Sequence, residues 1–342
     1  MKVLVTGGLG FIGSHTVVEL QNEGFDVVVI DDLSNSSLEV LDGIEAITGI
    51  KPEFEQIDLR DKAAVQRFFT NYSDVSGIIH FAASKAVGES VYNPLLYYEN
   101  NVGSLVHLLQ GFQRKTEGYF IFSSSCTVYG QAEKMPINEC APIKLPISPY
   151  SNTKQIGEEI IIDLAKVSSI NAVLLRYFNP IGAHPSNNIG ELPKGAPLNL
   201  VPFITQTAIG IREQLSVFGS DYDTIDGTCI RDYIHVVDVA RAHVMALQRL
   251  AERKNTEKVE VFNLGTGKGS TVLQVINAFE RVSGQKLNYK ITDRRPGDVT
   301  ATFADTEKAN KILGWRAELS LDVALESAWK WEQKIKGEPI IK

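Results

Sequence analysis

Tyr150 and Lys154 are two side chains that could transfer a proton together. They stand four residues apart at the start of a predicted helix, Tyr150–Lys166. That spacing places both side chains on one face of a helix. A tyrosine phenol has a pKa near 10 and is a poor base at neutral pH, but a neighbouring ammonium group favours the phenolate. The pair therefore predicts a general base.

Three consecutive serines, Ser123 to Ser125, could supply hydroxyl groups to that base. They follow the apolar run Tyr119–Phe122, which predicts a buried strand. Ligands of open α/β sheets bind beyond the carboxyl ends of the strands. We therefore expect one of these hydroxyls to position a substrate oxygen or to relay its proton.

The elements that would position these groups alternate along the first half of the chain. Short, continuous apolar runs are separated by stretches of helical periodicity, which is typical of strands buried on both faces and covered by helices. Such repeats predict an α/β protein with a doubly wound parallel sheet, the Rossmann fold. Strands are expected at Val3–Val5, Val27–Ile30, Phe54–Ile57, Gly77–His80, Tyr119–Phe122 and Ala172–Tyr177, and helices at Ile12–Asn22, Ala63–Thr70, Leu95–Phe112 and Tyr150–Lys166.

The second half of the chain has a different composition. Pro180–Pro202 is rich in Pro, Gly and Asn and is predicted to be a loop. A helix at Val236–Leu250 and a strand at Val259–Leu264 are predicted to return to the sheet. We therefore expect a cofactor-binding domain over 1–180, with returns near 236–264, and a smaller, interleaved substrate-binding lobe over 181–342.

A glycine-rich turn follows the first strand. Gly7, Gly10 and Gly13 are spaced GxxGxxG, with Phe11 and Ile12 opening the next helix. In this position the first glycine makes the turn, the second lets a pyrophosphate approach the backbone, and the third lets the helix pack on the sheet. The free N–H groups and partial positive charge of the helix N-terminus then favour an anion. The turn predicts a dinucleotide site.

Two carboxylates at the end of the second strand favour NAD over NADP. Asp31 and Asp32 could bind the adenosine ribose hydroxyls and would repel a 2′-phosphate. Asp58, expected at the end of the third strand, could accept a bond from the adenine amino group. A bound NAD⁺ would also add a positive nicotinamide ring beside Tyr150. Lowering the phenol pKa by about three units requires roughly 4 kcal/mol, which Lys154 and that ring together could supply.

Composition and charge exclude several other classes of protein. The net charge of −7 argues against a nucleic-acid partner, and no apolar run is long enough for a membrane span. The six histidines do not fall into a metal-ligand spacing, so we expect no metal. The three cysteines, Cys126, Cys140 and Cys229, form no disulfide framework, and the chain starts in a strand instead of a signal peptide. These features favour the reducing cytoplasm.

The motifs together resemble the extended short-chain dehydrogenase/reductase family, in particular its members that epimerise UDP-linked hexoses at carbon 4. The resemblance covers nearly the whole chain. Its motifs are TGGLGFIGSH at 6–15, HFAASKAVGES at 80–90, YYENNVGS at 97–104, FSSSCTVYG at 122–130, SPYSNTK at 148–154, LRYFNPIGAHPS at 175–186, GTCIRDYIHVVDVARAH at 227–243 and RRPGDV at 294–299.

The resemblance implies an NAD-dependent isomerase that interconverts UDP-galactose and UDP-glucose through a 4-keto intermediate. It implies Tyr150 as the base, Ser125 as its hydroxyl partner and Lys154 on the nicotinamide ribose. The cofactor contacts that it implies, with those expected above, are Gly7, Gly10, Phe11, Ile12, Gly13, Asp31, Asp32, Asn35, Ser36, Ile57, Asp58, Phe81, Ala82, Lys85, Asn100, Ser123, Tyr150, Lys154 and Tyr177. The implied substrate contacts are Lys85, Ser125, Tyr150, Phe178, Asn179, Asn199, Leu200, Phe218, Arg231, Tyr233, Arg295, Asp298 and Thr302.

The chemistry of the substrate set agrees with that implication. Arg231 and Arg295 could clamp a diphosphate, Phe218 offers a face to uracil, and Asp298 could accept ribose hydroxyls. Two positions depart from many relatives. Cys126 stands where they carry alanine, and Thr302 stands where they carry a bulky aromatic or a small residue. A small residue there goes with tolerance of a 2-acetamido group, so UDP-GlcNAc and UDP-GalNAc are expected as further substrates.

Three alternatives remain open from the sequence. Dehydratases and decarboxylases of this fold carry acidic residues where this chain has Cys126-Thr127. A non-catalytic NAD sensor could lose Tyr150 or Lys154, but both are present. A net dehydrogenase would release NADH. The resemblance also implies a homodimer, and apolar residues of the helices Leu95–Phe112 and Tyr150–Lys166 favour it: Leu105, Leu108, Ile156, Ile160 and Ile161.

Overall fold

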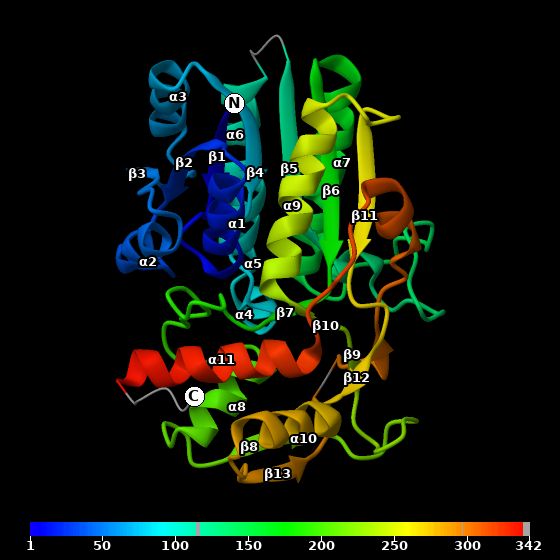
Figure 1. The fold of residues 1–342 in the computed structure, drawn as a ribbon. Coiled ribbons are helices and arrows are strands. Elements are labelled where there is room, and N and C mark those ends of the chain that lie inside the picture. The colour runs from blue at the N-terminus through cyan, green and yellow to red at the C-terminus, as the bar shows by residue number, and fades with distance from the viewer. Residues whose placement is uncertain (114–116, 296, 338–342) are drawn as a thin grey trace.

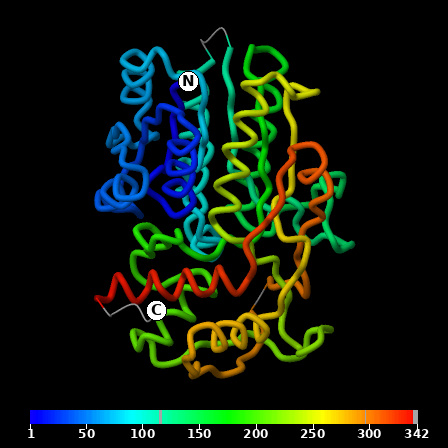
Figure 2. The backbone as a smooth tube through the Cα atoms, viewed as in Figure 1, coloured from blue at the N-terminus to red at the C-terminus, as the bar shows by residue number. Residues whose placement is uncertain are grey.

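A parallel sheet forms the larger part of the computed structural model, which describes residues 1–113, 117–295 and 297–337 (Figures 1 and 2). Seven strands lie in the order β11-β6-β5-β4-β1-β2-β3, and every neighbouring pair is parallel. The strands are β1 Lys2–Thr6, β2 Asp26–Asp31, β3 Glu53–Gln56, β4 Val75–His80, β5 Gly118–Ser125, β6 Ile170–Tyr177 and β11 Val259–Leu264. The predicted doubly wound sheet is confirmed, with its switch in strand order between β1 and β4.

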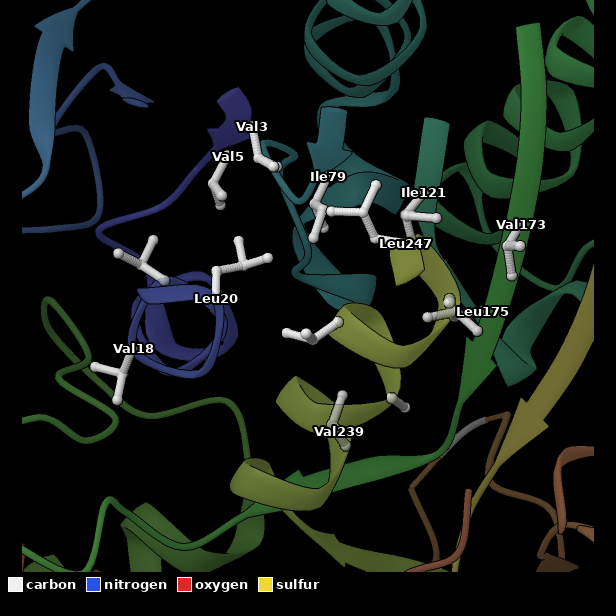
Figure 3. Packing of buried hydrophobic residues seen from close by; sticks show 14 of the residues in the cluster. Val3, Val5, Val18, Leu20, Ile79, Ile121, Val173, Leu175, Val239 and Leu247 are labelled. Atoms are coloured by element: carbon white, nitrogen blue, oxygen red, sulfur yellow. The ribbon is translucent and has the colours of Figure 1, made fainter. Parts of the chain in front are cut away.

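Helices cover both faces of this sheet because the strand side chains alternate between the two faces. Val3 and Val5 of β1 pack with α1, α2 and α9, whereas Leu4 packs with α3, α6 and α7 on the other face. Figure 3 shows Val18 and Leu20 of α1 and Val239 and Leu247 of α9 beside the strands. Full burial of such side chains stabilises the fold by about 1.5–3 kcal/mol each. The helices are α1 Phe11–Asn22, α2 Glu39–Thr48, α3 Lys62–Asn71, α4 Val87–Tyr92, α5 Pro94–Tyr97, α6 Ser104–Phe112, α7 Pro149–Val167 and α9 Val236–Ala251.

The smaller lobe has its own apolar core beyond the carboxyl ends of the strands. Ile204, Phe279, Leu325 and Trp329 are buried there, and the Phe279 and Trp329 rings meet edge to face at 5.6 Å. Figure 1 shows α11 lying across the boundary between this lobe and the sheet. Its elements are β7 Asn179–Ile181, α8 Leu200–Ala208, β8 Leu215–Phe218, β9 Ile230–Arg231, β10 Tyr233–His235, β12 Ser270–Thr271, α10 Val272–Ser283, β13 Tyr289–Thr292, β14 Ala301–Thr302 and α11 Leu321–Lys336.

Four expectations require correction. Asp58 does not end the third strand, because β3 stops at Gln56 and the Asp58 carboxylate accepts the Arg60 backbone N–H in a turn (2.9 Å). The helix α2 had not been predicted. The expected helix Leu95–Phe112 contains a π-helical turn, Tyr98–Gly103, between α5 and α6. Such turns are frequent at functional sites.

The fourth correction concerns three of the five apolar residues offered as a dimer surface, since Ile156 and Ile160 are only half-buried. Leu105, Leu108 and Ile161 are fully buried against the sheet and so belong to the core of this chain. The exposed apolar side chains of this region instead lie on α4 and α5, at Val91, Tyr92 and Leu95. Among the described residues no helix has the length and apolar character needed to cross a bilayer. Pro296 and residues 338–342, which fall in an expected motif and in the expected lobe, lie outside the described residues.

Candidate active site

The end of β5 and the start of α7 bring the predicted proton-transfer groups to one edge of the sheet. Ser148 caps α7 by accepting the Ser151 N–H, and Pro149 occupies its first turn, so Tyr150 is fixed at the helix start. One turn later, Lys154 Nζ donates to the Ser123 carbonyl oxygen at 2.7 Å. Ser123 Oγ in turn shares a 2.5 Å hydrogen bond with the Tyr177 hydroxyl at the end of β6.

Burial dominates the electrostatics of this corner. It raises the pKa of Tyr150 well above the ordinary value, with Tyr177 adding to the rise and a hydrogen bond from Ser125 opposing it. Burial also lowers the pKa of Lys154 to about 8, against the opposing influence of Glu158. The protein's own groups alone do not lower the phenol pKa, since the free-energy cost of removing a phenolate from water exceeds the stabilisation that these neighbours supply. The expected lowering of the phenol pKa includes the charge of a bound nicotinamide ring, and it stays a prediction.

Directly beneath the corner lies a buried ion pair that the sequence reasoning missed. Arg176 Nε and Nη2 donate to the two Glu158 oxygens at 2.9 and 2.5 Å, and Ser124 Oγ donates to Glu158 Oε1 at 2.5 Å. Arg176 Nη1 also reaches the Tyr129 hydroxyl at 3.0 Å. The signal was available in the sequence, because Glu158 lies four residues after Lys154 on the same helix face.

The glycine turn has the geometry that a pyrophosphate requires. Gly7 has φ +67°, and a Cβ on Gly13 would come within 2.2 Å of the Gly7 carbonyl oxygen, so neither position accepts a side chain. No side chain caps the N-terminus of α1, and its first turn holds no acidic residue. The N–H groups there remain available to an anion, and the residues present therefore fit a dinucleotide.

Asp31 ties this turn to the tip of β2. Its carboxylate accepts the Leu9 N–H at 3.1 Å, the Leu33 N–H at 3.0 Å and the Ser36 hydroxyl at 2.6 Å. Three of the expected cofactor positions, Asp31, Asp32 and Ser36, thus share one loop. Asp58 lies two residues after Gln56, which pairs with Asp31, and its carboxylate forms an ion pair with Arg60 at 2.6 Å.

The other expected cofactor residues come from the strand and helices after β4. The Phe81 and Ala82 N–H groups donate to the Thr6 carbonyl oxygen, which places them beside the glycine turn. Asn100 lies in the π-helical turn and donates to Ser84 Oγ at 2.9 Å. Ile57 instead packs on the core beneath.

The expected substrate residues gather on the smaller lobe. Asp298 Oδ1 accepts from Arg231 Nη2 at 3.4 Å and from Arg295 Nη2 at 3.1 Å. The Arg295 guanidinium lies 5.6 Å from the centre of the Phe218 ring, which is partly exposed. Thr302 pairs with Arg231 between β14 and β9. In the neighbouring sheet Asn179 pairs with Tyr233 between β7 and β10.

Glu191, which sequence reasoning did not identify, connects a cofactor residue to a substrate residue. Its Oε1 accepts from Lys85 Nζ at 3.3 Å and from Asn199 Nδ2 at 2.8 Å. Asn199 immediately precedes Leu200, the first residue of α8. No spacing pointed to Glu191, because it lies in an irregular loop. Phe178 packs in a small buried cluster with Val128. The described residues contain no group of His, Cys, Asp and Glu side chains that could hold a metal ion.

Comparisons with known proteins agree with this geometry. The family model described as GDP-mannose 4,6 dehydratase matches residues 4–328. The chain is 48% identical to the UDP-glucose 4-epimerase of Bacillus subtilis over 333 residues, 97% of each chain. A crystal structure of UDP-glucose-4-epimerase from Stenotrophomonas maltophila with bound NAD and formylated UDP-arabinopyranose superposes with a TM-score of 0.94 at 44% identity, covering 98% of this chain and 99% of that one. The enzyme from Bifidobacterium longum, in complex with NAD⁺ and UDP, gives 0.92 at 46% identity over 98% of each chain.

Proposed function

The chain belongs to the UDP-glucose 4-epimerase family of nucleotide-sugar enzymes, and we propose that it interconverts UDP-galactose and UDP-glucose with NAD as a retained cofactor. The observation that carries this proposal is the corner of Tyr150, Lys154 and Ser123–Ser125 at the carboxyl edge of the sheet. There Lys154 Nζ lies 2.7 Å from the Ser123 carbonyl oxygen. The glycine turn on one side and the arginines on the other provide for the two ligands.

The residues after Ser125 favour epimerisation over dehydration, the reaction named by the matching family model. A dehydratase needs an acid and a base there, in addition to the tyrosine. This chain has Cys126, whose thiol pKa burial raises to about 12, so the thiol stays protonated at neutral pH. Thr127 supplies only a hydroxyl. Neither side chain does that second proton transfer.

When bound, NAD⁺ would supply a hydride acceptor for carbon 4, and its reduced form would supply the hydride to the other face of the 4-keto sugar. Tyr150 takes the proton of the 4-hydroxyl and gives it back after the sugar has turned, so the reaction has no net oxidation. Ser125 holds that oxygen in line, and Lys154 holds the nicotinamide ribose. Burial raises the Tyr150 pKa, and the positive charge of a bound nicotinamide ring would favour the phenolate.

The remaining contacts follow the layout of the site. We propose that the first domain, over 1–180 with returns near 236–264, binds NAD through the glycine turn and Asp31. The lobe over 181–342 would bind the UDP-hexose, with Arg231 and Arg295 on the diphosphate. Planar guanidinium groups match phosphate oxygens with paired hydrogen bonds.

Incubation of the purified protein with UDP-galactose, without added NAD, tests this function. Conversion to an equilibrium mixture with UDP-glucose, together with nicotinamide cofactor released on denaturation, is expected. Absence of conversion even with NAD⁺ supplied would contradict it. Exchange of labelled NAD⁺ during turnover would instead favour a net dehydrogenase.

We propose that UDP-GalNAc and UDP-GlcNAc are also substrates. Thr302 is half-buried beside Arg231 and is small. Thr302→Tyr is expected to abolish turnover of UDP-GalNAc while UDP-galactose is still converted, because the ring would fill the space of the acetamido group. Thr302→Ser is the matched control and should keep both. Wild-type protein that converts UDP-galactose but not UDP-GalNAc would refute the extension.

We also propose a cytoplasmic homodimer that pairs through α4 and α5. Val91, Tyr92 and Leu95 are 57%, 86% and 80% exposed, which is unusual for large apolar side chains on neighbouring helices. Leu95→Glu is expected to give monomers in sedimentation, and a monomeric wild-type protein would disprove the pairing. The free cysteines suit the reducing cytoplasm.

A further inference from the structure

Asp232 is a buried carboxylate between two residues of the proposed substrate site, Arg231 and Tyr233. It is fully buried, so it does not face a ligand itself. It directly follows β9, the central strand of a three-stranded sheet in the order β12-β9-β14. A fully buried carboxylate is costly unless its oxygens are hydrogen-bonded. Its partners therefore show what the protein gains from it.

The backbone of Asp232 joins two further substrate positions. Its N–H donates to the Thr302 carbonyl oxygen at 3.1 Å, and its carbonyl oxygen accepts the Asn179 N–H at 3.0 Å. Asp232 is thus hydrogen-bonded to Thr302 and Asn179 and adjoins Arg231 and Tyr233 in the chain. All four of these residues are expected around the hexose and the uridine.

The side chain of Asp232 fastens the outer strands of the same sheet to the central one. Oδ1 accepts the Thr266 N–H at 2.9 Å and the Thr266 hydroxyl at 2.7 Å, in the loop that leads to β12. Oδ2 accepts the Ala304 N–H at 3.1 Å, just after β14, and the Gly267 N–H at 3.3 Å. A Cβ on Gly265 would come within 2.3 Å of Oδ2, so the loop is closely fitted to the carboxylate.

We infer that Asp232 is a positioning residue that sets the uridine- and hexose-binding residues of the proposed epimerase without touching the substrate. A carboxylate suits this place because it only accepts hydrogen bonds and here meets four donors. An Asn side chain would place its own NH₂ donor against one of these N–H or O–H donors. Because two donors repel each other, the strands carrying Arg231 and Thr302 would move apart. The inference rests on the proposed function for the identity of the ligand, but the contacts belong to this chain alone.

Asp238 provides a matched control for a role in stability alone. Its carboxylate is also buried, and its Oδ2 accepts the Glu318 and Leu319 N–H groups at 3.1 and 2.9 Å. Neither of these partners belongs to the proposed substrate set. Both aspartates thus hydrogen-bond backbone groups that are distant in the sequence, but only Asp232 does so beside the proposed substrate residues.

The test measures UDP affinity by calorimetry, bound NAD after denaturation and melting temperature for wild type, Asp232→Asn and Asp238→Asn. Asp232→Asn is expected to weaken UDP binding about tenfold or more. Loss of one buried hydrogen bond, with the displacement of Arg231 that follows, changes a binding constant by about that factor. Its NAD content should stay at the wild-type level. Asp238→Asn should lower the melting temperature with UDP affinity within about twofold of wild type. Equal UDP affinity in Asp232→Asn and wild type, or equal weakening in the two variants, would overturn the inference.

A milder pair of variants keeps the test decisive if Asp232→Asn does not fold. Thr266→Val removes the hydroxyl that donates to Asp232 and that also accepts the Lys268 N–H, and it should weaken UDP binding about threefold. Thr266→Ser, which restores this hydroxyl, should recover the binding. Failure of serine to recover what valine loses would count against Asp232 as the positioning group. Because UDP binding is measured without turnover, wild-type protein that binds UDP but does not convert UDP-galactose would refute the proposed function alone.

Discussion

The catalytic corner and the arginine subsite use the same kinds of charge in opposite ways. In the corner, Glu158 and Arg176 have side chains only 6% and 7% exposed, and every bond between them lies within 2.9 Å. In the subsite, Arg295 is 58% exposed and Arg231 reaches Asp298 only at 3.4 Å. The corner is fully bonded in the protein itself. In the subsite the exposed Arg295 keeps donors for a ligand, whereas Arg231 Nη1 already donates to the Ile230 and Val299 carbonyl oxygens at 2.8 and 2.9 Å.

This difference matches the roles proposed for the two regions. Proton transfer needs reacting groups held in one geometry, which a buried, fully hydrogen-bonded network provides. A clamp on a diphosphate gains its energy by forming bonds to the ligand. The exposed Arg295 suits that role directly, whereas two backbone carbonyl oxygens already hold the Arg231 guanidinium in place. Variants in the two regions should therefore fail in different ways, in rate or stability for the corner and in affinity for the subsite.

The largest effect is expected from Tyr150→Phe. Loss of the phenol removes the general base, and kcat for UDP-galactose should fall about 10³-fold, or roughly 4 kcal/mol of barrier. NAD content should be unchanged, because the ring remains and the glycine turn is untouched. Single-turnover assays with UDP-galactose measure the loss. A variant that keeps a tenth of the wild-type rate would remove Tyr150 from the proposed role.

Glu158→Gln tests whether the ion pair under the corner is structural. Breaking a buried pair leaves the Arg176 charge uncompensated and should cost about 3 kcal/mol of unfolding free energy. Denaturant unfolding measures this cost. The adjacent, exposed Glu159→Gln is the control and should stay within about 0.5 kcal/mol of wild type. Equal stability of the two variants would show that the pair does not hold the corner.

Lys154→Met is expected to be inactive but more stable. The folded-state pKa of Lys154 is lowered to about 8 from an unfolded value of 10.5, so below pH 8 the lysine is charged in both states and burying that charge destabilises the fold. The variant should gain on the order of 2 kcal/mol at pH 7. The gain should shrink as pH rises from about 8 to 10.5, where the lysine becomes neutral. Melting temperatures across this range decide the matter, and a less stable variant at pH 7 would contradict the prediction.

The smallest effect is expected at the subsite. Arg231→Lys keeps the charge but loses the planar fork, so KM for UDP-galactose should rise about tenfold, or about 1.4 kcal/mol, with little change in kcat. Arg294→Lys is the control, since Arg294 lies on the surface in an ion pair with Asp221 and should leave KM unchanged. A fall in kcat with unchanged KM in Arg231→Lys would contradict the expectation that variants of the subsite affect affinity and not rate.

The sequence alone determined the regular part of the molecule. Apolar runs and the glycine spacing located the strands, α1 and α7, because these signals depend on local periodicity and on positions that admit only glycine. Residues at the strand ends could then be assigned to the cofactor-binding edge. The carboxyl ends of parallel strands meet at one edge of the sheet, independently of how the rest of the chain folds. The motif at Tyr150 and Lys154 depended only on helical spacing.

Tertiary structure alone decided the rest. Glu191 joins Lys85 to Asn199, and Asp232 joins Thr266, Ala304 and Asn179, across stretches of chain that no periodic pattern relates. Burial also decides the electrostatics of the protein's own groups, because the fold removes Tyr150 from water and so raises its pKa. Periodicity and turn chemistry are local properties of a sequence, whereas hydrogen-bond partners and desolvation depend on which distant segments the fold brings together.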